Sequence, residues 1–115
     1  MANGVIVPSK IDENISLTIG SDYTSNPTYE RAVCKNGVVE ICLVLTRSAS
    51  TATSFINVFV VPSEYAPKKL TPIIAYDATH DRAMTGYISD QGIGVVYREQ
   101  SDAIADIRVH AIYTL

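Results

Sequence analysis

The sequence predicts an all-β fold, an antiparallel jelly-roll-like sandwich or barrel of about 8–9 strands, and three observations support it. Short apolar segments recur at spacings of about 8 to 12 residues, separated by Gly, Pro, Asn and Asp clusters. No stretch has the apolar spacing of an amphipathic helix. Residues 105–115 alternate apolar and polar side chains, as a strand with one face on a core does.

A hairpin is predicted at Asn36-Gly37, because this pair favours the two-residue type I′ turn between antiparallel strands. Its strands cover residues 29–35 and 38–46, and the second carries an aliphatic residue at every second position from residue 39. The other predicted strands are 15–19, 54–61, 72–76, 83–88, 93–99 and 105–115. The predicted connections are surface loops at 21–28, 47–53 and 77–82, and a crossing between sheets at 62–69.

The hairpin register indicates that the two cysteines do not pair. It places Cys34 opposite Val39 and Cys42 opposite Arg31, on different faces of the ribbon. A disulfide needs Cα atoms within about 7 Å of one another. We therefore expect two free thiols, with Cys34 on the core face, and this favours synthesis in a reducing cytosol.

The chain is expected to form one domain. Residues 14–115 would make the head and residues 1–13 an N-terminal arm or attachment segment, because strand alternation begins near Asn14 and the C-terminal residues belong to a strand. The first ten residues lack the features of a secretory signal. No apolar run approaches the roughly 18 residues of a membrane span, so membrane insertion is not expected.

Composition disfavours two classes of function. A net charge of −3, with nine scattered Lys and Arg residues, argues against binding to nucleic acid, which needs clustered positive charge. The sequence has no Gly-rich phosphate loop, nucleophile elbow, zinc-protease helix or Cys-x-x-Cys pair. We therefore expect no enzyme, no catalytic residue, no cofactor and no metal.

One polar loop combines Asp77, His80 and Asp81, and two interpretations are open for it. Two carboxylates and an imidazole can hold a divalent cation. Alternatively, the segment is an ordinary turn in which Asp77 caps backbone amides, and this interpretation is favoured.

Three tyrosines lie in or beside polar segments: Tyr23, Tyr65 and Tyr76. An exposed aromatic ring with a hydroxyl suits a sugar ring or a partner protein. The alternative is that each ring packs over its own domain. Arg108 and His110, on the polar side of the terminal strand, are candidates for a subunit contact or a ligand shelf, or they simply face solvent.

The second half of the chain carries a resemblance to a known family. A hydrophobic strand leads into Pro62-Ser63-Glu64-Tyr65-Ala66-Pro67, followed by two strands, a turn at Gly92, a further strand and the terminal strand. With the preceding Asn36-Gly37 hairpin, this order resembles the C-terminal head, or knob, of bacteriophage receptor-binding, baseplate and tail-fibre proteins. The resemblance covers roughly residues 29–115 and rests on the order of strands and turns.

The resemblance implies a non-enzymatic adhesion module of the virion, made in the host cytoplasm and placed at the tail or baseplate tip. It implies a homotrimer that binds saccharide of the host cell surface and contacts other tail or baseplate proteins through its N-terminal side. The loop beside Tyr76 is the implied saccharide site, with Asp77, His80, Asp81 and Arg82 as its polar groups. The chain has no Trp, so tyrosine would replace it in stacking on sugar.

Apolar residues on the outer side of the hairpin independently suggest a subunit contact. Val38, Cys42 and Val44 lie opposite the core face, interrupted by Glu40, and such a stripe suits oligomer packing. The main alternative to adhesion is a structural virion protein, such as a head-fibre or capsid-decoration domain that binds other virion proteins. A cellular carbohydrate-binding or trimeric cytokine-like domain and an enzyme are the remaining alternatives.

Overall fold

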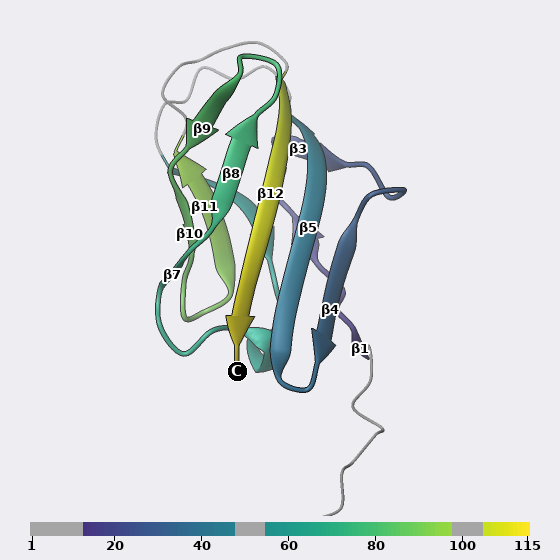
Figure 1. Cartoon of the computed structure of the whole chain (residues 1–115), viewed down its shortest axis with the longest axis vertical. Helices are drawn as coiled ribbons and strands as arrows, with labels where there is room; N and C mark the ends of the chain where they lie inside the picture. The colour runs from purple at the N-terminus through teal and green to yellow at the C-terminus, as the bar shows by residue number, and fades with distance from the viewer. Residues whose placement is uncertain (1–12, 48–54, 98–104) are drawn as a thin grey trace, which may run out of the picture.

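The protein is a β-sandwich of two antiparallel sheets, which confirms the predicted all-β class and selects the sandwich over the barrel (Figure 1). This computed structural model describes residues 13–47, 55–97 and 105–115. Its core consists of apolar side chains from the inner faces of both sheets. Packing two pleated sheets face to face buries one apolar surface of each.

The large sheet has seven strands. In spatial order they are β1 (Glu13–Asn14), β4 (Arg31–Lys35), β5 (Val38–Arg47), β12 (Ala105–Thr114), β8 (Ile74–Asp77) and β9 (Arg82–Met84), with β3 (Tyr23–Ser25) also paired to β5. The terminal strand β12 lies between β5 and β8 in the middle of this sheet (Figure 1).

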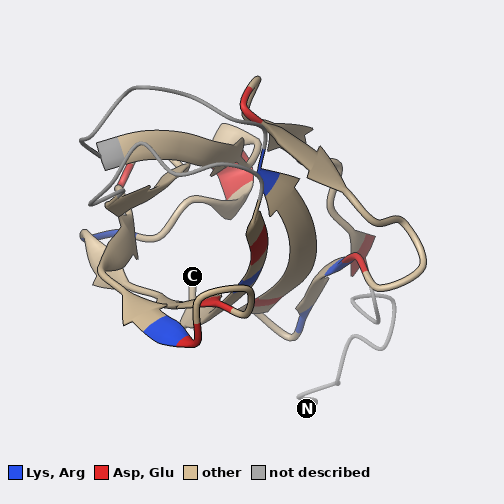
Figure 2. Cartoon of the chain, turned by 90° about the horizontal axis from the view of Figure 1, so that it is seen from above, with Lys and Arg blue, Asp and Glu red and all other residues tan. Residues whose placement is uncertain are grey.

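The small sheet has five strands. In spatial order they are β2 (Thr18–Ile19), β6 (Phe55–Val60), β11 (Ile93–Tyr97), β10 (Gly86–Ile88) and β7 (Thr71–Pro72). Seen from above, the two sheets face each other and the charged positions of the described residues are dispersed along the ribbons (Figure 2). This dispersion agrees with the charge pattern of the sequence.

The long β5–β12 pair forms the centre of the large sheet and follows the predicted alternation. Ten consecutive residue pairs join the two strands, from Ala105 opposite Arg47 to Thr114 opposite Val38. The inward-facing residues are buried: Val39, Ile41, Leu43 and Leu45 on β5, and Ile107, Val109, Ala111 and Tyr113 on β12. Complete burial of one aliphatic side chain stabilises the fold by about 1.5–3 kcal/mol.

The predicted hairpin and its register are confirmed. Asn36 and Gly37 have φ angles of 53° and 77°, and positive φ at both central positions defines the type I′ turn. Cys34 lies opposite Val39, and Cys42 lies opposite Arg31. Both cysteines are free thiols, as predicted.

Three predicted strands are wrong as single units, because the chain changes sheet inside each of them. In residues 15–19, Ile15 still bonds to Ala32 of the large sheet just after β1 ends at Asn14, whereas Thr18 and Ile19 form β2 of the small sheet. Residues 72–76 divide between β7 and β8, and residues 83–88 between β9 and β10. The apolar pattern continues through each corner, the point where the chain passes from one sheet to the other, because a corner residue such as Ile73 is also buried in the core. Division of these three raises the eight predicted strands to eleven, and β3, in the predicted loop 21–28, makes 12 strands in the described part of the chain.

Two residues assigned to surface loops are instead buried in strands. Tyr23, in the predicted loop 21–28, begins β3 and is only 6% exposed. Arg47, assigned to the start of a loop, ends β5 and is 1% exposed. Arg47 continues the inward-facing series of β5 and is held by pairing with Tyr23 on one side and Ala105 on the other. The rest of the predicted 47–53 loop lies outside the described residues.

The predicted crossing at residues 62–69 is also corrected. This segment contains a short 3₁₀ helix, Ser63–Tyr65, and leads from β6 to β7 at the opposite edge of the same small sheet. The change of sheet comes next, at Ile73. Tyr29 lies before the first residue of β4 and is 62% exposed, so the strand begins later than predicted. Leu115 lies beyond the last β5–β12 pair and is 37% exposed, so it leaves the core face.

Candidate functional site

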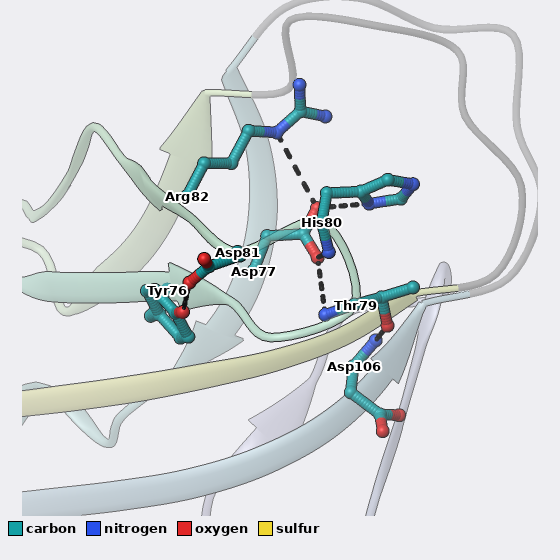
Figure 3. Close-up of polar contacts among 7 residues, drawn as sticks. All are labelled: Tyr76, Asp77, Thr79, His80, Asp81, Arg82 and Asp106. Carbon is teal, nitrogen blue, oxygen red and sulfur yellow. Dashed lines mark hydrogen bonds and ion pairs between the residues drawn. The ribbon is translucent and has the colours of Figure 1, made fainter.

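The loop between β8 and β9 is organised around the buried carboxylate of Asp77 (Figure 3). Its Oδ1 accepts hydrogen bonds from the backbone N–H groups of Thr79, at 3.1 Å, and His80, at 3.0 Å. Its Oδ2 lies 2.8 Å from Nδ1 of His80 and 3.8 Å from Nε of Arg82. The carboxylate therefore acts as the internal anchor of the loop, which is the capping role favoured from the sequence.

The charge state of Asp77 follows from two opposing influences. Burial raises the pKa of this carboxyl, whereas the hydrogen bonds from the His80 backbone and ring and the nearby charges of His80 and Arg47 lower it. The net result is a pKa below the ordinary value of 3.8. Asp77 is thus an ionised acceptor whose oxygens face donors of its own chain, and a cation in this loop would compete with those donors.

Two further contacts fasten the loop to its surroundings. The Asp106 N–H, at the start of β12, donates to Oγ1 of Thr79 at 2.8 Å. The hydroxyl of Tyr76 donates to Oδ1 of Asp81, and this hydrogen bond is the main reason that the pKa of Tyr76 is raised. Asp81 has a φ of 54°, a left-handed conformation that Asp tolerates better than most residues. The loop therefore holds the Tyr76 ring in a fixed position.

Five of the seven sequence-predicted site residues come together at this end of the sandwich (Figure 3). They are Tyr76, Asp77, His80, Asp81 and Arg82. The remaining two, Tyr23 and Tyr65, do not join them.

Tyr23 is part of the core, so its predicted exposed role is wrong. Tyr65 packs against the core at the other end of the molecule. Its carbonyl accepts a 2.5 Å hydrogen bond from the hydroxyl of Tyr113, near the end of β12, whereas Asp77 pairs with Ile107, near the start of that strand. Its own hydroxyl donates to Oε1 of Glu13 at 3.3 Å. The ring fastens the 3₁₀ helix and is not beside the loop.

A shallow groove of about 240 Å³ lies on the outer face of the large sheet, next to this loop. Its exposed walls include Tyr29, Ile74 and Tyr76, with Arg108 and His110 beside them. The arrangement follows from the sheet register, because Arg108 pairs with Tyr76 and His110 with Ile74. Outward-facing side chains of paired residues lie next to one another. Aromatic rings, an aliphatic surface and two nitrogen-bearing side chains thus share one hollow.

Sequence reasoning identified Tyr76 and treated Arg108 and His110 as open alternatives, but it missed Tyr29 and Ile74 as members of the groove. Ile74 lies in a predicted apolar strand, and the sequence pattern does not indicate that its side chain is 68% exposed. The pairing of β8 with β12 supplies this information, and no local pattern encodes it.

A larger hollow of about 500 Å³ lies over the small sheet between residues 18–22 and 56–60. The residues that line it include no Tyr, His or Arg, and Phe59 in its floor is fully buried. It therefore lacks an exposed aromatic ring and a cationic hydrogen-bond donor, and the groove is the stronger candidate site.

Comparison with known proteins does not identify the chain. No protein-family model matches it, and a search of curated proteins finds no significant relative. Within the described residues, no helix is long and apolar enough to span a membrane.

Proposed function

We propose that this protein is a non-enzymatic adhesion module of a bacteriophage virion that binds host cell-surface saccharide in the groove beside Tyr76. The observation that carries the proposal is a partly exposed aromatic ring, fixed by its bond to Asp81, next to Arg108 and His110. The resemblance to phage tail heads supplies the biological setting, the tail or baseplate tip. The β-sandwich fold is compatible with such a head.

The groove has the chemistry that saccharide recognition uses. A pyranose ring presents C–H groups on its faces and hydroxyls at its edge, so it suits an aromatic surface beside hydrogen-bonding side chains. Tyr76 and Tyr29 supply the aromatic surface, while Arg108 and His110 lie where they can bond hydroxyls. Asp81 shares its carboxylate with Tyr76 and can accept a further hydroxyl. Asp77 supports the site from within, because its oxygens serve the loop itself.

We further propose that three copies associate through the outer face of the large sheet. Ile112 is 56% exposed on β12 and pairs with Glu40 of β5, away from the loop end of the sheet. Val38, at the same end, is half-buried on the same strand pair. Packing of this end against neighbouring copies would cover aliphatic surface and leave Tyr76 near the rim of the contact.

One observation favours the alternative, a structural virion protein that binds other virion proteins. Ile74 and Ile112 are highly exposed aliphatic residues on one sheet face, and such side chains suit a protein contact better than a sugar. This alternative predicts the same fold and association without saccharide binding.

Saccharide binding is tested by screening the protein on an array of bacterial surface saccharides and titrating the best ligand. We expect Tyr76→Ala to weaken binding by about 10-fold, because stacking and burial of the ring are lost. The matched control is Tyr97→Ala, since Tyr97 is exposed to a similar extent, 36% against 37%, but lies on the small sheet. No binding on the array, or equal losses in the two variants, would contradict the saccharide proposal and favour the structural alternative.

Association is tested separately by light scattering. We expect a trimer for the natural sequence and a monomer for Ile112→Asp, because a carboxylate would be buried at the contact. Leu70→Asp is the control, since Leu70 is similarly exposed, at 59% against 56% for Ile112, but lies outside both sheets. A monomeric natural protein at micromolar concentration would contradict the trimer while leaving the saccharide test unaffected.

A further inference from the structure

Three side chains with metal-binding atoms meet on the outer face of the large sheet: Glu40, Cys42 and His110. One carboxylate oxygen, the thiol sulfur and one imidazole nitrogen all lie within 4.8 Å of one another. All three residues are half-buried. The cluster is separate from the Asp77 loop.

Strand register explains why these residues meet. Glu40 and Cys42 are two positions apart on β5, so their side chains point to the same face. His110 is directly opposite Cys42 on β12. Both strands are long and centrally placed, and the positions of the three Cβ atoms are therefore fixed by the main hydrogen-bond ladder rather than by a loop.

The spacing suits a tetrahedral metal. Bonds of about 2.0–2.3 Å to oxygen, nitrogen and sulfur place the ligands of tetrahedral zinc about 3.3–3.8 Å apart. Nε2 of His110 lies 3.4 Å from Oε2 of Glu40, which is already within this range. The Cys42 sulfur lies within 4.8 Å of the other two ligand atoms, so the remaining distances would have to shorten by at most about 1.5 Å to reach this range.

The neighbouring charges prepare the carboxylate for this role. Arg31 donates to Oε1 of Glu40 at 3.1 Å, while Oε2 faces His110. These two hydrogen bonds lower the pKa of Glu40, so the group is ionised at neutral pH. Oε2 is the oxygen available to a metal, and Arg31 would remain on Oε1 as an outer-shell partner that orients the ligand.

We propose that Glu40, Cys42 and His110 bind one Zn²⁺ ion through Oε2, Sγ and an imidazole nitrogen, with the fourth position left for a ligand from outside this copy of the chain, such as water. A mixed thiolate, imidazole and carboxylate set suits zinc better than magnesium or calcium, which prefer oxygen ligands alone. Binding replaces the S–H bond of Cys42 with a Zn–S bond and releases that proton to the solvent. The metal also needs an imidazole nitrogen without a proton, so coordination through Nε2 of His110 replaces its hydrogen bond to Glu40 and leaves the proton of the neutral ring on Nδ1. No change of oxidation state is involved. Cys42 and His110 also border the groove, so a bound Zn²⁺ ion would take His110 away from the proposed saccharide.

The test is titration of the metal-free full chain with Zn²⁺, with affinity measured by competition against a chromogenic chelator. We expect one equivalent to bind. Cys42→Ser and His110→Gln should each weaken the affinity by about 100-fold or more, since loss of an outer-shell partner alone costs about 10- to 100-fold. Co²⁺ should give thiolate-to-metal absorption in the natural sequence, and this band should be absent in Cys42→Ser.

Two matched variants distinguish Zn²⁺ binding at this site from Zn²⁺ binding to the other cysteine or the other histidine. Cys34→Ala keeps Cys42 and removes the buried thiol, and His80→Gln keeps His110 and alters the Asp77 loop. Both should bind Zn²⁺ with affinity within about threefold of the natural sequence if folded, which circular dichroism checks. Absence of binding up to about 0.1 mM Zn²⁺, or equal affinity in Cys42→Ser, would overturn the proposal. The metal titration uses no saccharide, so failure of the zinc proposal and failure of the saccharide proposal are read from separate experiments.

Discussion

The two faces of the β5–β12 strand pair differ in how their side chains are held. The inner face contains aliphatic residues such as Leu45 and Ile107, both fully buried, and apolar packing fixes them. The outer face mixes charged, sulfur-bearing and aliphatic side chains, with Ile112 more than half exposed and Glu40 bonded to Arg31 and His110. One strand pair therefore supplies both the stability of the sandwich and its most chemically varied surface.

This difference shows how a small sandwich can separate stability from binding. Successive side chains of a strand point to opposite faces, so a substitution on the outer face leaves the packing of the inner face unchanged. The outer face can carry the groove and the cluster of Glu40, Cys42 and His110 at little cost to folding. The following predictions test this separation, from the largest expected effect to the smallest.

Replacement of an inner-face residue should destabilise the fold most. Ile107→Ala is expected to lower the free energy of unfolding by about 2–5 kcal/mol, because it removes buried methyl groups and leaves a cavity. Ile112→Ala changes the same residue type on the same strand but on the outer face, and should cost at most about 0.5 kcal/mol when both variants are compared as monomers at low protein concentration. Urea unfolding measures both. Equal losses in the two variants would mean that the outer face contributes as much to the free energy of unfolding as the inner face does.

The buried carboxylate at the end of the sheet should have the next largest effect. Asp77→Asn is expected to cost about 1–3 kcal/mol at pH 7, because the charge-assisted hydrogen bonds to His80 weaken. Asp77 has a folded-state pKa below 3.8, so its ionised form stabilises the protein fully at pH values well above 3.8. This contribution is lost as the pH falls through the folded-state pKa.

The pH dependence supplies the check on Asp77. The difference in unfolding free energy between the natural sequence and Asp77→Asn should be constant from about pH 5 to 7 and should shrink below about pH 4. A difference that does not change between pH 7 and pH 3 would show that the charge of Asp77 is not what stabilises the loop.

The reactivity of the two thiols compares the inner face with the outer face without a destabilising substitution. In the native protein we expect Cys42 to be modified faster than Cys34, which is protected because it is only 6% exposed on the inner face. Burial and the charge of Glu40 raise the pKa of Cys42, so it should react more slowly than a free cysteine near neutral pH. Kinetics with a disulfide reagent, using Cys42→Ser to assign the fast phase, measure this. Two equally fast thiols would indicate that the inner face opens readily.

Part of the candidate site could be predicted because it lies in one short segment. Tyr76, Asp77, His80, Asp81 and Arg82 are close in sequence, and the turn chemistry of aspartate brings them together whatever the surrounding fold. Tyr23 misled sequence reasoning, because polar neighbours suggested a loop while pairing with Arg47 placed it in the core. Corners such as Ile73 were also missed, since an apolar residue at a sheet change preserves the pattern of one strand.

The amino-acid sequence by itself determined the local features: the strand faces, the Asn36-Gly37 turn with its register, and the separation of the two thiols. These follow from side-chain alternation and from the φ angles that a two-residue turn requires. Only the tertiary structure decided which strands are neighbours. The placement of β12 between β5 and β8 brings His110 to Cys42 and Arg108 to Tyr76, because pairing between distant segments depends on packing of the whole sandwich rather than on any local pattern.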